Sequence, residues 1–246
     1  MFSISAVLPA YNEEKVIADT VAAVVAALTD VTDDYEVVVV NDGSRDRTRQ
    51  VVEELSAANP RVRCVSHPVN RGYGAALGTG FASSTKELVF MTDGDKQFDP
   101  WEIALFLPHI DRADLVIGYR SPRRDPFMRL VNAWGWNLLV RLLFGYVARD
   151  VDCAFKLFRR SVLEDVRVES TGATFSSEFL IKARRRGHRI VEMRATHYPR
   201  TVGSATGAKL SVIVRAFREL IKLRLSLSKS MNAAKEPLGD VTRGSA

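Results

Sequence analysis

The sequence contains little cysteine. Two cysteines, Cys64 and Cys153, occur among its 246 residues, and they lie far apart in the chain. They form neither a CxxC pair nor a disulfide framework, so nothing here indicates an oxidising compartment. We therefore expect a protein of a reducing environment, the cytoplasm.

Long hydrophobic runs are also missing. No window of about 18 residues lacks a charged side chain, and the most apolar stretch, LVNAWGWNLLVRLLFGYV, contains Arg141 and follows Arg129. A membrane-spanning helix is therefore not expected. The first residues run directly into SISAVLPAYNEE, without the basic and apolar regions of a signal peptide.

The composition is that of an ordinary globular protein, with 46% hydrophobic and 26% charged residues. The net charge of +6 points to an anionic partner, which could be phosphate groups, nucleic acid or an anionic membrane surface. Basicity without any function fits the composition equally well. Clustered aromatic and basic elements are missing, so no nucleic acid partner is expected.

The first half of the chain alternates short β-branched runs with helical patterns, which predicts an α/β fold with a mostly parallel sheet covered on both faces. The runs that predict strands are ISAVLP, YEVVVVND, VRCVSH, ELVFMTD and DLVIGYR. Helices are expected over residues 13–28, 47–57, 74–83 and 100–110.

The second half predicts an apolar helix over residues 127–147, a helix over 176–186, the strand HRIVEMRATHYP and a last helix over 208–228. No linker divides the chain, so residues 1–230 are expected to form one domain, with a nucleotide-binding half (1–120) and an acceptor half (121–230). Residues 231–246 have little to bury, and a disordered tail is expected there.

The last helix is amphipathic. Arg215, Arg218, Lys222 and Lys229 line one side of a broad apolar face that comprises Leu210, Ile213, Val214, Phe217, Leu220, Ile221 and Leu225. Such a helix can lie on an anionic bilayer, or it can pack on its own domain with a solvated basic face. Both interpretations stay open at this point.

Three of the expected strands end in polar turns, PAYNEE, NDGSRD and TDGDKQ. Ligands of open α/β sheets bind outside the carboxyl ends of strands, so these turns are expected to face one crevice. In the third turn, Asp93 and Asp95 stand two residues apart across Gly94, with Gln97 just beyond. Two carboxylates at this spacing can reach one Mg²⁺ or Mn²⁺, which would bridge a diphosphate.

In this order, VLPAYNEE, VVVVNDGSRDRT, NRGYGAALGTGF, MTDGDKQFDP and GYR resemble the family 2 glycosyltransferases of the GT-A fold. More narrowly, the chain resembles the dolichyl- and polyprenyl-phosphate sugar transferases. The resemblance covers roughly residues 3–225. It implies a mostly parallel central sheet flanked by helices, with amphipathic helices near the C-terminus.

The resemblance also implies roles for the donor side. Pro9, Tyr11 and Glu13 would hold the base and ribose of a nucleoside-diphosphate sugar, and Asp42 would bind the base. Asp93 would lie near the ribose and the metal, and Asp95 and Gln97 would bind the metal. The residues alone allow other roles, because Asp42 before Gly43 suits a turn and Glu13 suits the first turn of a helix. The glycines of NRGYGAALGTG would let a helix start approach the diphosphate.

On the acceptor side, the resemblance implies that Arg120 faces the acceptor phosphate. Arg129 and Asn132 could also line this side, or they could lie on a solvated face of their helix. Arg200 and Ser204 match a loop in which the arginine grips the donor diphosphate as charge develops. The chain departs from that loop at Lys209, which follows Ser204 by five residues. His197, just before the loop, could touch the diphosphate or be structural.

DVDCAFK resembles a further family element, with Ala154 in place of the usual glycine. There Asp150 would orient or deprotonate the acceptor, with Asp152 and Glu178 as other candidate bases. The implied activity is inverting, metal-dependent transfer of a sugar from a GDP- or UDP-sugar to a polyprenyl phosphate, at the cytoplasmic face of a membrane. The alternatives are transfer to a hydroxyl of a glycan, glycolipid or small polar acceptor, and a non-catalytic module that binds nucleotide sugars.

Overall fold

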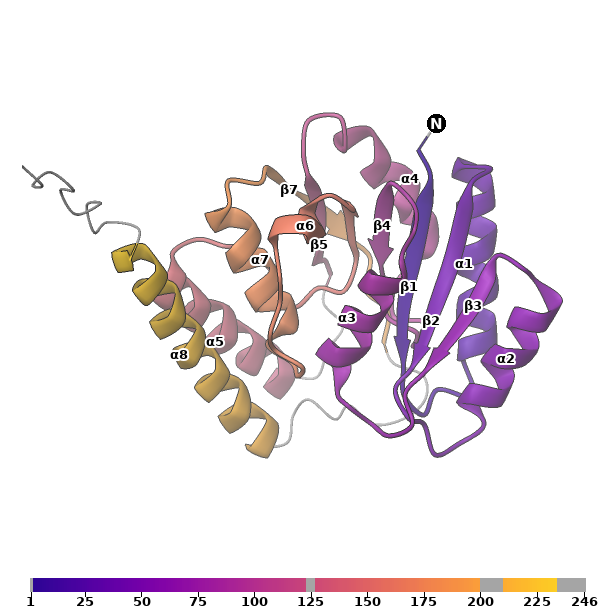
Figure 1. Cartoon of the computed structure of the whole chain (residues 1–246), viewed down its shortest axis with the longest axis horizontal. Helices are drawn as coiled ribbons and strands as arrows, with labels where there is room; N and C mark the ends of the chain where they lie inside the picture. Colours follow the sequence, from indigo (N-terminus) through magenta and orange to yellow (C-terminus); the bar gives the residue numbers. More distant parts are fainter. Residues whose placement is uncertain (1, 123–126, 200–209, 234–246) are drawn as a thin grey trace, which may run out of the picture.

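The computed structural model of the chain describes residues 2–122, 127–199 and 210–233 (Figure 1). Its centre is a seven-stranded sheet in the order β3-β2-β1-β4-β6-β5-β7. The strands are β1 (Ile4–Ala10), β2 (Tyr35–Asn41), β3 (Val62–Ser66), β4 (Leu88–Met91), β5 (Leu115–Arg120), β6 (Lys156–Arg159) and β7 (Ile190–Ala195). β1, β2 and β4 are buried along their whole length, as expected of continuous apolar runs in a covered sheet.

One strand was not predicted from the sequence. β6 pairs antiparallel with both β4 and β5, so it joins the second half of the chain to the parallel strands of the first half. Its four residues are too few to show a clear strand pattern, and they begin with a lysine. The remaining pairings are parallel, which confirms the mostly parallel sheet.

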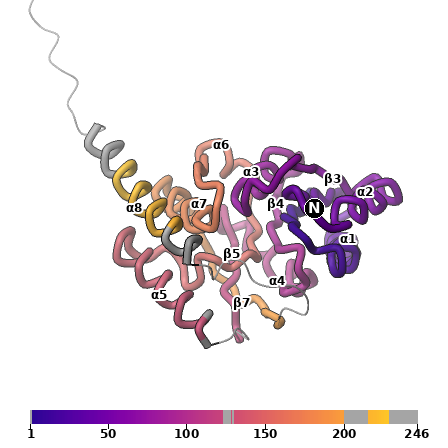
Figure 2. The backbone as a smooth tube through the Cα atoms, turned by 90° about the horizontal axis from the view of Figure 1, so that it is seen from below, coloured from indigo at the N-terminus to yellow at the C-terminus, as the bar shows by residue number. Residues whose placement is uncertain are grey.

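Helices cover both faces of the sheet. Figure 2 shows α3 and α7 on one face and α1 and α4 on the other. The bounds are α1 (Ile17–Val31), α2 (Thr48–Ala58), α3 (Tyr73–Ser83), α4 (Ile103–Phe106), α5 (Phe127–Phe144), α6 (Val162–Asp165), α7 (Phe175–Arg185) and α8 (Leu210–Ala233).

Several predicted helix bounds were wrong, among them the end of α8, which lies at Ala233 instead of residue 228. α1 begins at residue 17 instead of 13, because residues 14–16 form a turn and the backbone N–H of Glu13 bonds to Thr48 at the start of α2. The helix expected over 100–110 is divided into η1 (Pro100–Glu102), α4 and η2 (Leu107–His109). Pro108 lacks a backbone N–H and its ring crowds the preceding turn, so a regular helix cannot continue through it.

Phenylalanines join the two halves of the core. The ring centroid of Phe155 lies 4.8 Å from that of Phe90 and 4.8 Å from that of Phe106. Phe81 of α3 packs edge-on against Phe158 of β6, with 5.2 Å between centroids. Because these contacts link segments from both halves, packing as well as the sheet runs continuously across residue 120.

α8 packs partly on its own domain. Ala216, Leu220 and Leu223 are buried, whereas Phe217 and Leu225 are exposed. The packing interpretation therefore holds for the buried side of this helix. The side chains of Leu210, Ile213, Val214 and Lys229 lie outside the described residues, as do residues 234–246 of the expected tail. Over the described ranges, no helix is both long and apolar enough to cross a membrane.

Candidate active site

The three polar turns lie at one edge of the sheet. β2, β1 and β4 are parallel neighbours, and they end at Asn41, Ala10 and Met91. Because parallel strands run in the same direction, the turns that follow them meet at the carboxyl edge. This agrees with the expectation of one shared crevice.

The first two turns are tied to each other. Asn12 donates its backbone N–H to Ser44 Oγ at 3.0 Å, and its side-chain oxygen accepts the Arg45 N–H at 2.8 Å. The backbone N–H of Glu13 donates to Thr48 Oγ1 at 2.8 Å, at the start of α2. These bonds hold Pro9, which is buried in β1, and the half-buried Tyr11 beside the end of β2.

Asp42 organises the loop that precedes α3. Its Oδ1 accepts the backbone N–H of Arg71 at 2.8 Å and lies 2.7 Å from His67 Nδ1, and its Oδ2 accepts the N–H of Gly72 at 2.8 Å. His67 Nε2 in turn lies 2.9 Å from Thr79 Oγ1 of α3. These three contacts hold the carboxylate of Asp42 against residues 67–72.

Two glycines of NRGYGAALGTG, Gly72 and Gly74, pack closely against the loop before α7. Gly72 has φ +101°, and a side chain there would come within 2.6 Å of the carbonyl oxygen of Thr171. The backbone N–H of Ala75 donates to that same oxygen at 3.1 Å. The expectation was a close approach to a diphosphate, whereas the close neighbour in this structure is the loop before α7.

The third turn brings two carboxylates together. Tyr73, the first residue of α3, donates its hydroxyl to Asp93 Oδ1 at 2.9 Å. Burial, and then the negative charge of Asp95, raise the pKa of Asp93 to about 7. Lys156 and Arg120 act against this shift but do not outweigh it.

Asp95 and Gln97 are both buried and are held by the turn. Asp95 Oδ1 accepts the backbone N–H of Gln97 at 3.1 Å. Gln97 Nε2 donates to the carbonyl oxygen of Tyr198 at 3.1 Å, and the Tyr198 N–H returns a bond of 2.8 Å to the Gln97 carbonyl. Since its amide nitrogen faces Tyr198, the amide oxygen of Gln97 is the atom that a cation would take.

This donor set fits a hard divalent cation. Two crowded carboxylates and an amide oxygen are oxygen ligands of the kind that Mg²⁺ and Mn²⁺ prefer. Within the described part of the chain, no three histidine, cysteine, aspartate or glutamate side chains gather where they could hold a metal. The protein would therefore supply few ligands, and substrate oxygens and water would supply the others.

On the acceptor half, Arg120 and Asp150 form a buried ion pair. Arg120 Nε and Nη2 donate to the two oxygens of Asp150, each at 2.7 Å, and the Arg120 backbone N–H adds a bond of 3.3 Å. Burial works against the guanidinium charge, but the bonds and the charge of Asp150 outweigh it and raise the pKa of Arg120. A bidentate pair of this kind holds the arginine at the end of β5 in one orientation.

The comparison with protein families now identifies the fold and the chemistry. The model of a family described as glycosyl transferase family 2 matches residues 5–167, which is more than half of the chain. The chain belongs to this family. It is therefore a glycosyltransferase, and the predicted resemblance is confirmed.

Several relatives of this family 2 glycosyltransferase have assigned names. Dodecaprenyl-phosphate galacturonate synthase of Rhizobium johnstonii is 30% identical over 89% of this chain and 65% of its own length. Dolichyl-phosphate beta-glucosyltransferase of Trichomonas vaginalis is 30% identical over 90% of this chain and 73% of its own length. An undecaprenyl-phosphate 4-deoxy-4-formamido-L-arabinose transferase of Pseudomonas fluorescens is 31% identical over 70% and 51%. The chain spans between about half and three quarters of the lengths of these relatives.

Solved structures confirm the GT-A fold. Glucosyl-3-phosphoglycerate synthase of Mycobacterium tuberculosis, crystallised with phosphoglyceric acid, has a TM-score of 0.67 at 23% identity, covering 92% of this chain and 79% of that one. The same synthase with Mn²⁺, uridine diphosphate and its product has a TM-score of 0.66 at 21% identity, with the same coverage.

Two residues of this family 2 chain were not assigned a role from the sequence. Lys156 is fully buried at the start of β6 and donates its ammonium group to the carbonyl oxygens of Val151, at 3.4 Å, and Cys153. Burial lowers the pKa of Lys156, and the charges of Cys153, Asp152, Asp150 and Asp93 oppose that shift. The one feature of the sequence that could have indicated a buried charge was this single lysine inside the apolar run AFKLF.

Tyr73 is the second residue that was missed, because only the fold brings its hydroxyl to Asp93. Of the predicted acceptor residues, Asn132 is exposed on α5. His197 is buried, and its ring packs edge-on against that of Phe98, with 5.4 Å between centroids. Arg200, Ser204 and Lys209 lie outside the described residues, as does the side chain of Arg129.

Glu178, the other candidate base, is buried and is bonded to its neighbours on α7 and on the loop before it. It accepts the backbone N–H groups of Glu169 and Ser170 at 2.9 and 3.0 Å and pairs with Lys182 at 2.7 Å. Burial raises the pKa of Glu178, but the bonds from Lys182, Ser170 and Glu169 outweigh it and lower the pKa overall. This carboxylate therefore serves as the anchor of the loop before α7.

Proposed function

We propose that this family 2 glycosyltransferase transfers a sugar, with inversion, from a nucleoside-diphosphate sugar to a polyprenyl phosphate. The names of the relatives support a polyprenyl phosphate as the acceptor. Those at 30–31% identity are named for dodecaprenyl, dolichyl and undecaprenyl phosphate. An oxygen of the acceptor phosphate forms the new bond to the anomeric carbon while the bond to the nucleoside diphosphate breaks.

The donor would lie across the carboxyl edge of β2, β1 and β4. Pro9, Tyr11 and Glu13 are proposed to hold its base and ribose, with Asp42 at the base. The bonds that Asp42 makes to the loop at residues 71–72 support a second role for it, which is to shape that loop around the nucleotide. Residues 1–120 would thus form the nucleotide-binding half.

Asp93, Asp95 and Gln97 are proposed to hold a divalent cation, Mg²⁺ or Mn²⁺. When bound, the cation would neutralise charge on the departing diphosphate. The crowding of Asp93 and Asp95 supports this proposal, since two nearby carboxylates favour a cation. The related fold of glucosyl-3-phosphoglycerate synthase has been crystallised with Mn²⁺ and with Mg²⁺. Arg200 is proposed to add a second positive charge at the leaving diphosphate.

Arg120 is proposed to bind the acceptor phosphate, with Arg129, Asn132 and Ser204 nearby. Within the described residues, two of its five N–H donors bond to Asp150, and the others are those that a phosphate would take. Asp150 then acts as a positioning residue that holds Arg120. A phosphate is already an anionic nucleophile near neutral pH, so this reaction needs no strong general base.

The rival function is transfer to a sugar hydroxyl, or to a small polar acceptor, which would need a base. Asp150 and Glu178 hold Arg120 and Lys182 in ion pairs, and Asp152 is the further candidate base for this rival. Asp152 is half-buried, and Ser177 Oγ donates to it at 3.5 Å. Loss of a base would lower turnover about 10²- to 10⁴-fold.

A lipid acceptor also implies a place of action. We propose that the protein works at the cytoplasmic face of a membrane as a peripheral protein, with the acceptor phosphate at the lipid surface. The absence of cysteine pairs, the basic charge and the amphipathic α8 support this location.

The proposal is tested by pairing UDP-glucose and GDP-mannose in turn with a short polyprenyl phosphate dispersed in detergent. Labelled sugar is followed into butanol, with and without EDTA. Chelator-sensitive transfer into the lipid is expected with one of the two donors, which would also identify the nucleotide. Hydrolysis of both donors without a lipid product would contradict the proposal.

Asp152→Asn separates the two acceptor chemistries. With a phosphate acceptor, turnover should fall less than about tenfold, and the pH profile should keep its shape. A loss of a hundredfold or more, together with activity on water-soluble sugars, would support the hydroxyl acceptor instead.

A further inference from the structure

One face of α5 carries a row of exposed apolar side chains. Trp134 and Leu142 have exposed fractions of 68% and 75%, the largest values among the large hydrophobic residues of the described chain. The row, which we call the α5 stripe, comprises Met128, Val131, Trp134, Leu138 and Leu142. Its spacing of three or four residues places these side chains along one side of a helix.

The opposite side of the same helix is packed. Val140 is buried, and Leu139, Leu143 and Phe144 pack against the core. Trp136 also faces inward and donates its indole N–H to Ser177 Oγ at 3.1 Å. α5 is therefore fully used by the fold on one side, and the α5 stripe is apolar surface beyond what the fold requires. Contiguous surface of this kind marks an interaction site.

The charge around the α5 stripe is positive. Residues 127–149 contain three arginines and no acidic residue, and α8 contains five basic residues and one acid. These two segments thus carry a net charge of +7, against +6 for the whole chain. The one acid, Glu219, is bonded to Arg215 at 2.9 Å and to Thr174, so it offsets Arg215 and leaves the other bases of α8 without an acid on the same helix.

α8 lies beside α5, and both views show the pair at the side of the molecule farthest from α2 (Figures 1 and 2). Its exposed residues Arg218 and Lys222 add bases, and Phe217 and Leu225 add apolar surface. An apolar stripe with basic neighbours complements an anionic lipid surface. A second copy of the chain is a poorer partner, because the two basic faces would repel each other.

The α5 stripe is also close in sequence to the proposed acceptor site. β5 ends at Arg120, and α5 begins seven residues later, at Phe127. A helix lying in the membrane interface would hold the end of β5 near the lipid phosphates. This link rests on the proposed function, whereas the stripe and its charge do not.

We infer that the α5 stripe is the surface by which the protein docks on an anionic bilayer. α5 lies in the interface plane with Trp134 and Leu142 among the lipid headgroups, and α8 supplies further positive charge. α8 was a candidate membrane helix, but its residues Leu220 and Leu223 are buried in the protein. Among the described side chains, α5 therefore exposes more large apolar residues than α8 does.

The test is co-sedimentation of the full chain with phosphatidylcholine vesicles that contain about one third phosphatidylglycerol. Leu142→Ser should lower the partition coefficient about fivefold, and Leu142→Ser with Trp134→Ser at least about twentyfold, since binding scales with buried apolar area. The matched control is Leu105→Ser on α4, where the leucine is 59% exposed and lies away from α5. That variant should sediment like the wild type.

Circular dichroism and thermal melting verify that each variant is folded. Wild-type protein that stays in the supernatant would overturn the inference, as would equal losses for Leu142→Ser and Leu105→Ser. A dimer that Leu142→Ser dissociates in gel filtration, without any vesicle binding, would assign the stripe to self-association and overturn it too. The transfer assay in detergent distinguishes membrane docking from the proposed transfer reaction. In detergent, the double variant of Leu142→Ser and Trp134→Ser should keep its transfer activity. Failure of the wild type in detergent refutes the transfer reaction and leaves the vesicle result to decide the docking surface.

Discussion

Two carboxylates at opposite ends of the same sheet show how differently this fold treats buried charge. Glu36 lies at the amino edge, near the start of β2, and Asp93 lies at the carboxyl edge, just after β4. Burial acts to raise the pKa of both. The outcome is opposite, because one carboxylate is surrounded by donors and the other faces a second acid.

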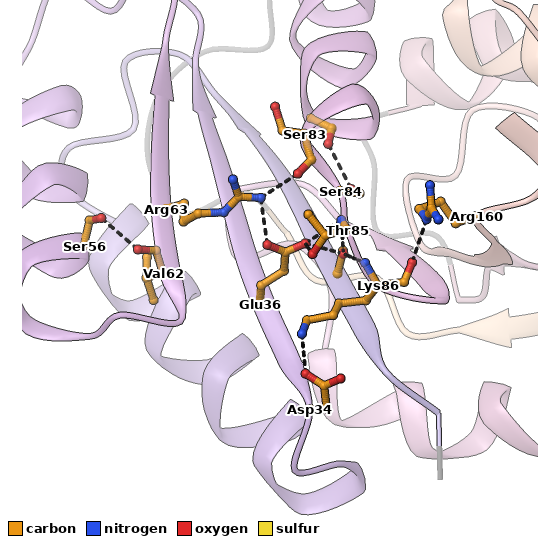
Figure 3. A network of polar contacts seen from close by, with 12 residues as sticks. Asp34, Glu36, Ser56, Val62, Arg63, Ser83, Ser84, Thr85, Lys86 and Arg160 are labelled. Carbon is orange, nitrogen blue, oxygen red and sulfur yellow. Dashed lines mark hydrogen bonds and ion pairs between the residues drawn. The ribbon is translucent and has the colours of Figure 1, made fainter. Parts of the chain in front are cut away.

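Both carboxylate oxygens of Glu36 accept hydrogen bonds from neighbouring residues (Figure 3). Its Oε1 accepts Ser5 Oγ at 2.7 Å, Thr85 Oγ1 at 2.9 Å and the Thr85 backbone N–H at 2.7 Å. Its Oε2 accepts Arg63 Nη2 at 2.7 Å. These bonds outweigh the effect of burial and lower the pKa of Glu36. The cluster ties β1, β2, β3 and the segment before β4 together, so its role is to stabilise the sheet.

Asp93 accepts one hydrogen bond from the Tyr73 hydroxyl, and it lies near the negative charge of Asp95. Burial and that charge raise the pKa of Asp93 to about 7. Such an arrangement is costly for the free protein and becomes favourable only when a positive charge arrives. The two edges therefore differ: one has a carboxylate that stabilises the sheet, and the other has two carboxylates that we propose to hold a cation. The predictions below test that separation, beginning with the largest effect.

Asp95→Ala should abolish most of the turnover while leaving the protein folded. We expect kcat/KM to fall at least about 100-fold, the size of effect that follows removal of one electrostatic contact to the departing group. The lost bond from the Gln97 N–H should lower the free energy of unfolding by no more than about 1 kcal/mol. Steady-state kinetics with saturating metal and a urea melt measure the two effects. A folded variant that is fully active would show that the site assignment is wrong.

Glu36→Gln should do the reverse. It removes a buried charge from four hydrogen bonds, so the free energy of unfolding should fall by about 2 kcal/mol. Turnover of the folded fraction should stay within twofold of the wild type, because the cluster lies at the edge away from the site. Urea unfolding followed by fluorescence, with activity measured well below the transition, verifies both. A selective loss of turnover would break the comparison.

The stabilising effect of Glu36 should depend on pH. Its pKa is lowered on folding from 4.5, so its contribution is fully present above that pH and is lost as the pH falls through the folded pKa. The stability difference between wild type and Glu36→Gln should therefore shrink at acidic pH. Urea midpoints for both proteins, at several pH values between about 7 and 3.5, provide the test. A difference that stays constant across this range would exclude the titration of Glu36 as its source.

Asp34→Asn should have the smallest effect. Asp34 pairs with Lys86 in the same cluster, but its side chain is 63% exposed (Figure 3). Exposed ion pairs contribute little, so the free energy of unfolding should change by less than about 0.5 kcal/mol. The same urea melt compares it directly with Glu36→Gln. Equal losses for the two variants would mean that burial does not distinguish the two carboxylates.

Much of the donor side could be predicted from the sequence. Continuous β-branched runs showed where β1, β2 and β4 lie, and strands that alternate with helices are typical of a parallel sheet. From these facts alone the turns containing Asp42 and Asp93 were expected at one edge. The fold confirms that they share the edge. Their roles toward a nucleotide and a metal stay predictions.

The acceptor side was harder to predict from the sequence, because its contacts join residues far apart in the chain. Arg120 and Asp150 are 30 residues apart, and nothing local to either residue indicates a bidentate pair. β6 is only four residues long, and its place between β4 and β5 depends on two antiparallel pairings. Lys156 was visible as a charge in an apolar run, but its carbonyl partners were not.

The amino-acid sequence by itself determined the local features of this protein: where most of its strands and helices lie, which turns carry acids, and that α8 is amphipathic. Local backbone preference and the period of apolar residues are sufficient for these, because they act within one segment. The tertiary structure alone decided that Trp136 packs inward while Trp134 is exposed, and that Glu36 is surrounded by donors while Asp93 faces Asp95. The free energy of a buried side chain depends on the atoms that other segments bring against it, and only the folded chain brings those atoms together.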